Sequence, residues 1–212
     1  MRKLYDFADK KGHFSAFFLL FILCLSPLFA DDDCLSYKVL PQVTVSSPEW
    51  AKSVVRSLRP MNMLHGNVAA TFIETYNLSA SAEQIEDGFC VVLNSVEAVV
   101  GYTDFLIQID SRYAPDSCRY NATMEHEDMH IRAHLSVVDD LNSEISSAIS
   151  HAANTVMPLF VRTNRDADAA LDKMSAEIQD NPNVILMRQK INAEQEMKNK
   201  RIDQNAGEIK CD

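Results

Sequence analysis

The stretch HEDMHIRAHLSVVDDLNSEISSAISHA, residues 126–152, determines the second half of the fold. Its apolar residues recur every three or four positions, which is the spacing of one face of an α-helix. The pattern predicts a long amphipathic helix that begins near Tyr120 and ends before Pro158. The first turns of its apolar face carry His126, Glu127 and His130. The later turns carry Val137, Val138, Leu141, Ile145, Ala148, Ile149 and Ala152.

Residues 126–130 form the pattern H-E-x-x-H. Two histidines four residues apart lie on one helical face, so both imidazoles can reach a single Zn²⁺ while the glutamate points toward a metal-bound water. The alternative is a hydrogen-bonded or solvated cluster, but three polar groups in one apolar seam are costly to bury separately. We therefore expect His126 and His130 to bind Zn²⁺ and Glu127 to act as the general base.

A catalytic zinc site normally has a third protein ligand. His134 lies on the same face, but about 12 Å of helical rise separates it from His126, which is too far for one ion. The third ligand should come from a later helix that returns alongside the first. The candidates there are Glu194, Glu196 and Asp203.

The first thirty residues are typical of a secretory signal peptide. Four basic side chains precede or flank the start of the apolar run 14–25, and Ala30 is followed by three aspartates. We expect cleavage after Ala30; because Leu28 is not the small residue usual at its position, an uncleaved signal anchor is the alternative. Residues 31–212 are then a single periplasmic or secreted domain with no membrane association after cleavage.

The chain is acidic. Its net charge is −10, and loss of residues 1–30, with four basic and two acidic side chains, makes it −12. Such a charge disfavours nucleic acids and anionic membrane surfaces as partners. A peptide or protein substrate is the partner expected instead.

The fold class expected from the whole chain is α+β, with N-terminal antiparallel strands followed by long C-terminal helices. Strands are expected at 37–45 and 68–76, a short helix after Ser46, and a hairpin of 90–100 with 105–110. Further helices are expected at about 167–178 and 184–202. Four cysteines remain after signal cleavage, an even number that predicts two disulfides in an exported protein. The hairpin brings residue 90 near 115, which favours the pairs Cys90–Cys118 and Cys34–Cys211.

Several segments resemble a bacterial family of secreted zinc-dependent proteases of unknown function. They are Tyr37-Lys38-Val39, Gly66-Asn67-Val68-Ala69-Ala70-Thr71, Cys90-Val91-Val92-Leu93 and the His126-Glu127-x-x-His130 helix. The resemblance implies a zincin-like fold, in which an edge strand, here Phe105 to Ile109, either holds substrate over the metal or is a plain sheet edge. The family's last helix ends in Tyr-Asp-x-x-Thr-x-His-Gly, of which residues 200–207 keep only the glycine, and Asp203 is the third-ligand candidate nearest that motif.

Two functions are consistent with these patterns. The first is a zinc metallopeptidase that hydrolyses peptide bonds with zinc-activated water. The second is a non-catalytic envelope or binding protein that retains a degenerate zinc site.

Overall fold

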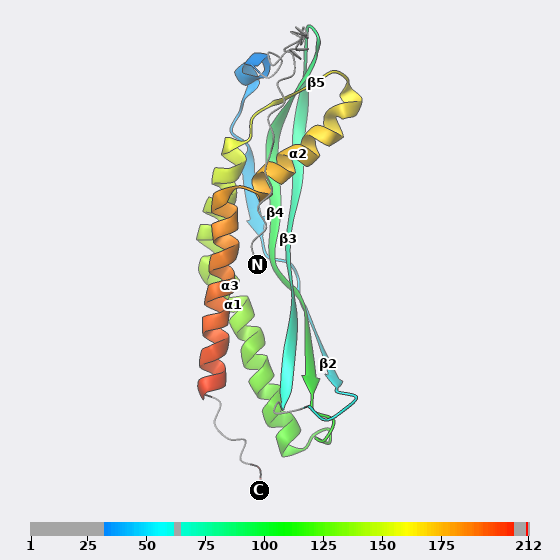
Figure 1. The fold of residues 1–212 in the computed structure, drawn as a ribbon, viewed down its shortest axis with the longest axis vertical. Helices are drawn as coiled ribbons and strands as arrows, with labels where there is room; N and C mark the ends of the chain where they lie inside the picture. Colours follow the sequence, from blue (N-terminus) through cyan, green and yellow to red (C-terminus); the bar gives the residue numbers. More distant parts are fainter. Residues whose placement is uncertain (1–31, 62–64, 206–210, 212) are drawn as a thin grey trace, which may run out of the picture.

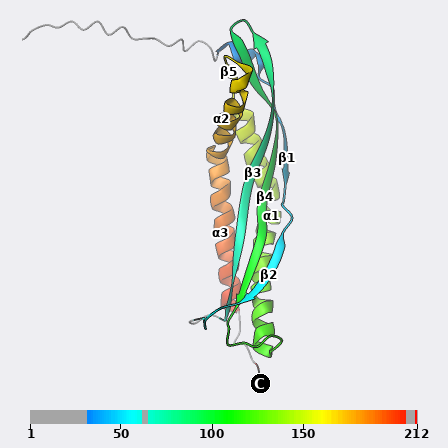
Figure 2. The same cartoon turned by 90° about the vertical axis from the view of Figure 1, so that its right-hand side faces the viewer.

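The computed structural model describes residues 32–61, 65–205 and 211, so the expected signal peptide lies outside the described residues. The molecule is elongated, with one long β-hairpin and a layer of helices along one side of it (Figures 1 and 2). Strands β3, Gly66–Ile85, and β4, Gly88–Ile109, pair antiparallel along their whole length. They form the frame to which the other elements attach.

Three short strands follow one another along the other edge of β4. Strand β5, Leu159–Val161, pairs antiparallel with the start of β4. Strands β1, Gln42–Ser46, and β2, Ala51–Arg56, pair parallel with its middle and its end. The sheet is therefore mixed, and the expectation of an antiparallel, zincin-like α+β fold is wrong.

The prediction of a short helix after Ser46 is also wrong, because this segment forms β2. Trp50, Val54 and Leu58 do have helical spacing, but β4 offers an unpaired edge to the residues between them. Pairing with that edge satisfies the backbone of a segment that contains two adjacent β-branched valines. Pairing with β4 therefore decides the structure of this exposed segment, and its helical spacing does not.

The turn expected near Gly101 is a bulge inside one continuous strand. Thr71 pairs with Asp104 and Phe72 with Tyr102, so Thr103 is an extra residue on β4. A bulge of this kind reverses which face successive side chains occupy. The buried side chains shortly before it have even numbers, 96, 98, 100 and 102, and those after it have odd numbers, 105, 107 and 109. The turn expected at residues 101–104 is therefore wrong, because β4 continues through them.

The helices agree with the sequence predictions. Helix α1 is Cys118–Thr155, α2 is Ala167–Gln179 and α3 is Pro182–Asn205, with 3₁₀ turns η1, Asp32–Tyr37, and η2, Asn164–Asp166. The hydroxyl of Ser117 caps α1 by accepting a hydrogen bond from the Tyr120 N–H. Helices α1 and α3 run side by side in opposite directions (Figures 1 and 2).

The core lies between the inner face of β4 and the helices. The fully buried side chains include Phe105, Ile107, Ile109, Ile145, Ile149, Met174, Ile178 and Ile191. Each contributes about 1.5 to 3 kcal/mol by leaving water. This packing fixes the rotation of α1, so the predicted apolar stripe faces the sheet.

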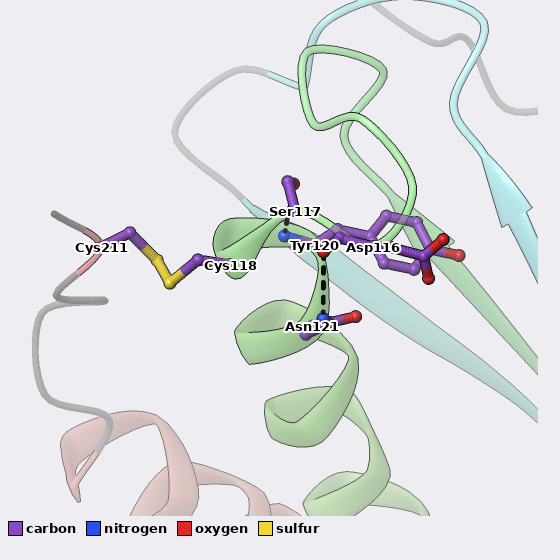
Figure 3. The surroundings of a disulfide bond; sticks show 6 residues. All are labelled: Asp116, Ser117, Cys118, Tyr120, Asn121 and Cys211. Carbon is purple, nitrogen blue, oxygen red and sulfur yellow. Dashed lines mark hydrogen bonds between the residues drawn. A yellow bond between two sulfur atoms is a disulfide. The ribbon is translucent and has the colours of Figure 1, made fainter.

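The two disulfides do not have the expected partners. Cys34 is bonded to Cys90, and Cys118 is bonded to Cys211 (Figure 3). Because β4 does not fold back, its length of about 60 Å separates Cys90 from the region of Cys118. Two disulfides are consistent with a secreted protein. Among the described residues, no helix is long and apolar enough to cross a membrane.

Candidate metal centre

Helices α1 and α3 place matching polar side chains opposite one another. Gln195 contacts His134, Asn199 contacts His130, and Asp203 contacts both His130 and His126. The contacting residues are spaced four apart on both helices, and their numbers rise along α3 as they fall along α1. This is the pattern of two antiparallel helices packed in register. This register brings the H-E-x-x-H histidines to the end of α3.

Three ligand atoms gather where the helices meet. The Nε2 atoms of His126 and His130 are 3.2 Å apart. Oδ1 of Asp203 lies 3.1 Å from the His130 Nε2 and 3.4 Å from the His126 Nε2. Among the described residues, these three side chains are the group of histidine, cysteine and carboxylate ligands close enough to hold a metal ion. The arrangement can therefore bind a metal.

The hydrogen bond on the far side of His130 favours one tautomer of its ring. Its Nδ1 lies 3.0 Å from Oδ1 of Asn199. An amide oxygen only accepts hydrogen bonds, so Nδ1 must carry the proton. In a neutral imidazole this leaves the Nε2 lone pair directed at the cluster, which is the state that a metal ligand needs.

Burial favours the neutral form of the His126 ring. Desolvation is the main cause that lowers its pKa, and the neighbouring His130 lowers it further, against the opposing effect of Asp203. Two imidazoles and one carboxylate are a common ligand set for a divalent metal in a hydrolase.

Glu127 lies between the histidines and is only 4% exposed. Its burial is the main cause that raises its pKa to about 7. Gly66, the first residue of β3, makes room for it, since a Cβ there would lie 2.9 Å from the Glu127 Oε1 and 2.6 Å from the Thr123 Cγ2. The close approach of β3 to α1 therefore encloses the carboxyl group.

A cavity of about 520 Å³ opens beside these residues. Its wall opposite α1 is the start of β3, from His65 to Val68. The remaining lining residues are His126, Glu127, His130, His134, Asn199 and Asp203. The candidate ligands and the candidate base thus face one space large enough for part of a small ligand or peptide.

His134 is near the metal centre but is not part of it. Tyr102 donates a hydrogen bond to the Gln195 Oε1, so the Gln195 amide nitrogen donates to Nε2 of His134 at 3.1 Å. The His134 Nδ1 is buried and has no hydrogen-bond partner among the described residues. Desolvation lowers the pKa of this histidine to about 4, so it stays neutral.

Of the three predicted candidates for third ligand, the structure brings only Asp203 to the histidines. Glu194 and Glu196 are outside the cluster because the face of α3 that meets α1 carries residues 195, 199 and 203. Sequence reasoning missed Asn199 and Gln195, although their spacing of four residues from Asp203 was a usable signal. His65, which lines the cavity, was also missed, because it belongs to no motif in the sequence.

The strand Phe105 to Ile109, expected at the sheet edge, lies inside the sheet. It pairs with β3 on one side and with β2 on the other, so neither alternative for an edge strand applies to it. Among the described strands, β3 pairs with β4 alone, which places a free β3 edge next to the cavity. Comparison of the chain with family models, curated proteins and solved structures found no match.

Proposed function

We propose that this protein is an exported zinc-dependent hydrolase that cleaves peptide bonds, with zinc held by His126, His130 and Asp203. The observation that carries the proposal is the triangle of ligand atoms, with sides of 3.1, 3.2 and 3.4 Å. Tetrahedral zinc with ligand bonds of 2.0 to 2.1 Å separates its ligands by about 3.3 Å. All three sides fit that value, and the Nδ1 hydrogen bond of His130 supplies the required tautomer.

Bound zinc would acidify a water molecule and polarise the substrate carbonyl. Glu127 is the residue that accepts the proton from the attacking water and passes it to the leaving amine. Its position one residue after a ligand, on the same buried face, brings its carboxyl group into the cavity. The enclosure by Gly66 limits competing water around it.

The free edge of β3 suggests how a substrate is held. An extended peptide can add to such an edge through backbone hydrogen bonds. The first residues of β3, Gly66 to Val68, line the cavity that holds the metal ligands. A peptide paired with this edge would pass in front of the three ligands, so an unfolded segment fits better as a substrate than a folded surface.

The second candidate is a non-catalytic binding protein that uses the same metal site. The exposure of the Asp203 side chain, 63%, favours this reading, because a catalytic ligand is usually more enclosed. Both candidates bind zinc, so metal content does not separate them.

Turnover of a broad peptide library by the zinc-loaded mature protein separates the two candidates. We expect wild type to cleave and Glu127→Gln to lose about 10² to 10⁴ in rate while keeping its zinc. Glu125→Gln is the matched control, because this exposed glutamate lies two positions away on the same helix. Absence of cleavage by zinc-loaded wild type would leave the non-catalytic candidate.

A further inference from the structure

The two halves of α3 are held to the molecule in different ways. The buried residues of α3 are Val184, Met187 and Ile191, all in its first half. From residue 192 to 205 no side chain of the helix is buried. Fully buried apolar side chains therefore anchor the start of α3, whereas the proposed metal ligand Asp203 lies near its end.

The contacts between the second half of α3 and α1 are mainly polar among the described residues, although the half-buried Ile202 shares a groove with Met129 and Ala133. The ammonium group of Lys198 is 2.6 Å from the Asp140 carboxylate, which is 66% exposed. Gln195 and Asn199 add single hydrogen bonds to His134 and His130. Exposed pairs of this kind contribute about 0 to 1 kcal/mol each, and the last turns of a helix open readily. These contacts are weak anchors for a ligand that must be placed to a fraction of an ångström.

A disulfide joins the chain beyond this weakly held end to α1. Cys118 is the first residue of α1, eight positions before His126, and Cys211 follows Asp203 by the same interval. Figure 3 shows the bond beside the first turn of α1, with Cys211 on the chain that follows α3. The covalent link thus closes the same end of the molecule that carries the metal ligands.

We propose that the Cys118–Cys211 disulfide is a positioning element of the metal centre that raises its zinc affinity through Asp203. This inference rests on the metal site of the proposed function. The cross-link keeps the end of α3 close to α1, which raises the effective concentration of the Asp203 carboxylate at the two imidazoles. The ordering of α3 is then largely complete before the metal binds.

A double-mutant cycle on zinc affinity tests the proposal. Cys118→Ser/Cys211→Ser, Asp203→Ala and the combined variant are titrated with zinc against a chelating dye, using the full mature chain. We expect removal of the disulfide to weaken zinc binding on the order of tenfold when Asp203 is present. When Asp203 is absent, it should cost nothing further, because the link acts only through that carboxylate.

The other disulfide provides the matched control. Cys34 and Cys90 join η1 to the start of β4, in a separate buried cluster. Cys34→Ser/Cys90→Ser also removes two cysteines and one cross-link, so it should lower thermal stability but leave zinc affinity unchanged. Hydrogen exchange of the metal-free protein supplies a second measurement. Removal of Cys118–Cys211 should speed exchange in residues 192–205 and leave residues 182–191 unchanged.

Each outcome decides a different question. Wild type that binds no zinc would overturn the metal site and this inference together. Zinc binding by wild type with equal affinity in Cys118→Ser/Cys211→Ser would overturn only the inference. The same holds if the loss persists fully in the Asp203→Ala background, or if removing this disulfide unfolds the whole protein, since the link would then act globally.

Discussion

The contacts around His130 show how single residues bring candidate metal ligands together. One ring nitrogen is fixed by the Asn199 amide oxygen, and the other faces His126 and Asp203. Four polar side chains thus converge on one point at the end of α3. A divalent ion at that point would be bound by the two imidazoles and the carboxylate together.

The first prediction is that His130→Ala abolishes zinc binding. Wild type should hold one zinc per chain, and the variant should hold none, because two ligands of three are too few for a stable site. Elemental analysis of the purified proteins measures this. His151→Ala is the control, as His151 is exposed on the same helix. Equal zinc content in all three proteins would remove His130 from the site.

The second prediction concerns Asn199. Replacing it with alanine removes the acceptor that keeps the proton on the His130 Nδ1. Loss of such a supporting partner typically weakens metal affinity by about 10- to 100-fold. A chelator competition assay measures the change, and Asn192→Ala, at an exposed position on α3, should show none. An unchanged affinity in Asn199→Ala would mean that another contact sets the tautomer.

At the scale of elements, the sequence predicts the helices well and the strands poorly. The periodicity of residues 126–152 continues without interruption, so the bounds of α1 followed from it. Strand β4 changes parity at Thr103, and the segment that became β2 depends on a neighbour distant in sequence. Local patterns carry no information about such pairing, and both disulfide assignments failed for the same reason.

The same limit applies to the candidate site. Both histidines and the glutamate could be predicted because they share one helix. Asp203 could only be named as one of three candidates, since its choice depends on the register between α1 and α3. That register follows from apolar packing of residues such as Ile191 with the rest of the core, which no local pattern specifies.

The third prediction tests the bulge. Deleting Thr103 would restore strict alternation and turn the side chains of Phe105, Ile107 and Ile109 from the core to the solvent face. Burial of each side chain contributes about 1.5 to 3 kcal/mol. Losing all three should remove most of the free energy of unfolding, which is about 5 to 15 kcal/mol for a typical domain. Thermal unfolding measures it. Thr103→Ala keeps the extra residue and should retain the fold; a stable deletion variant would show that the sheet can shift its register.

At the scale of the whole molecule, the long hairpin separates two ends, each of which carries one disulfide. The Cys34–Cys90 bond lies at the end where β4 starts, and the candidate metal ligands with Cys118–Cys211 lie where β4 finishes. Helix α1 spans most of the distance and α3 returns along it (Figure 1). Consequently, the candidate site lies where α3 contributes no buried side chain, and the Cys118–Cys211 disulfide can supply order there.

The last prediction is the pH dependence of stability in the metal-free protein. The folded pKa of Glu127 is raised to about 7, so its contribution to stability is fully present below its unfolded value of 4.5 and is lost as pH rises through 7. The folded pKa of His134 is lowered to about 4, so its contribution is present above 6.5 and is lost as pH falls through 4.

Between pH 4.5 and 6.5 these two effects oppose each other, because folding binds a proton at Glu127 and releases one at His134. Relative to wild type, Glu127→Gln should therefore lose stability as the pH is lowered across this window, and His134→Gln should gain it. Each slope is at most about 1.4 kcal/mol per pH unit. Chemical denaturation at a series of pH values, with chelator present, measures both. Parallel curves for the three proteins would mean that neither carboxyl nor imidazole is held in the environment that the structure gives it.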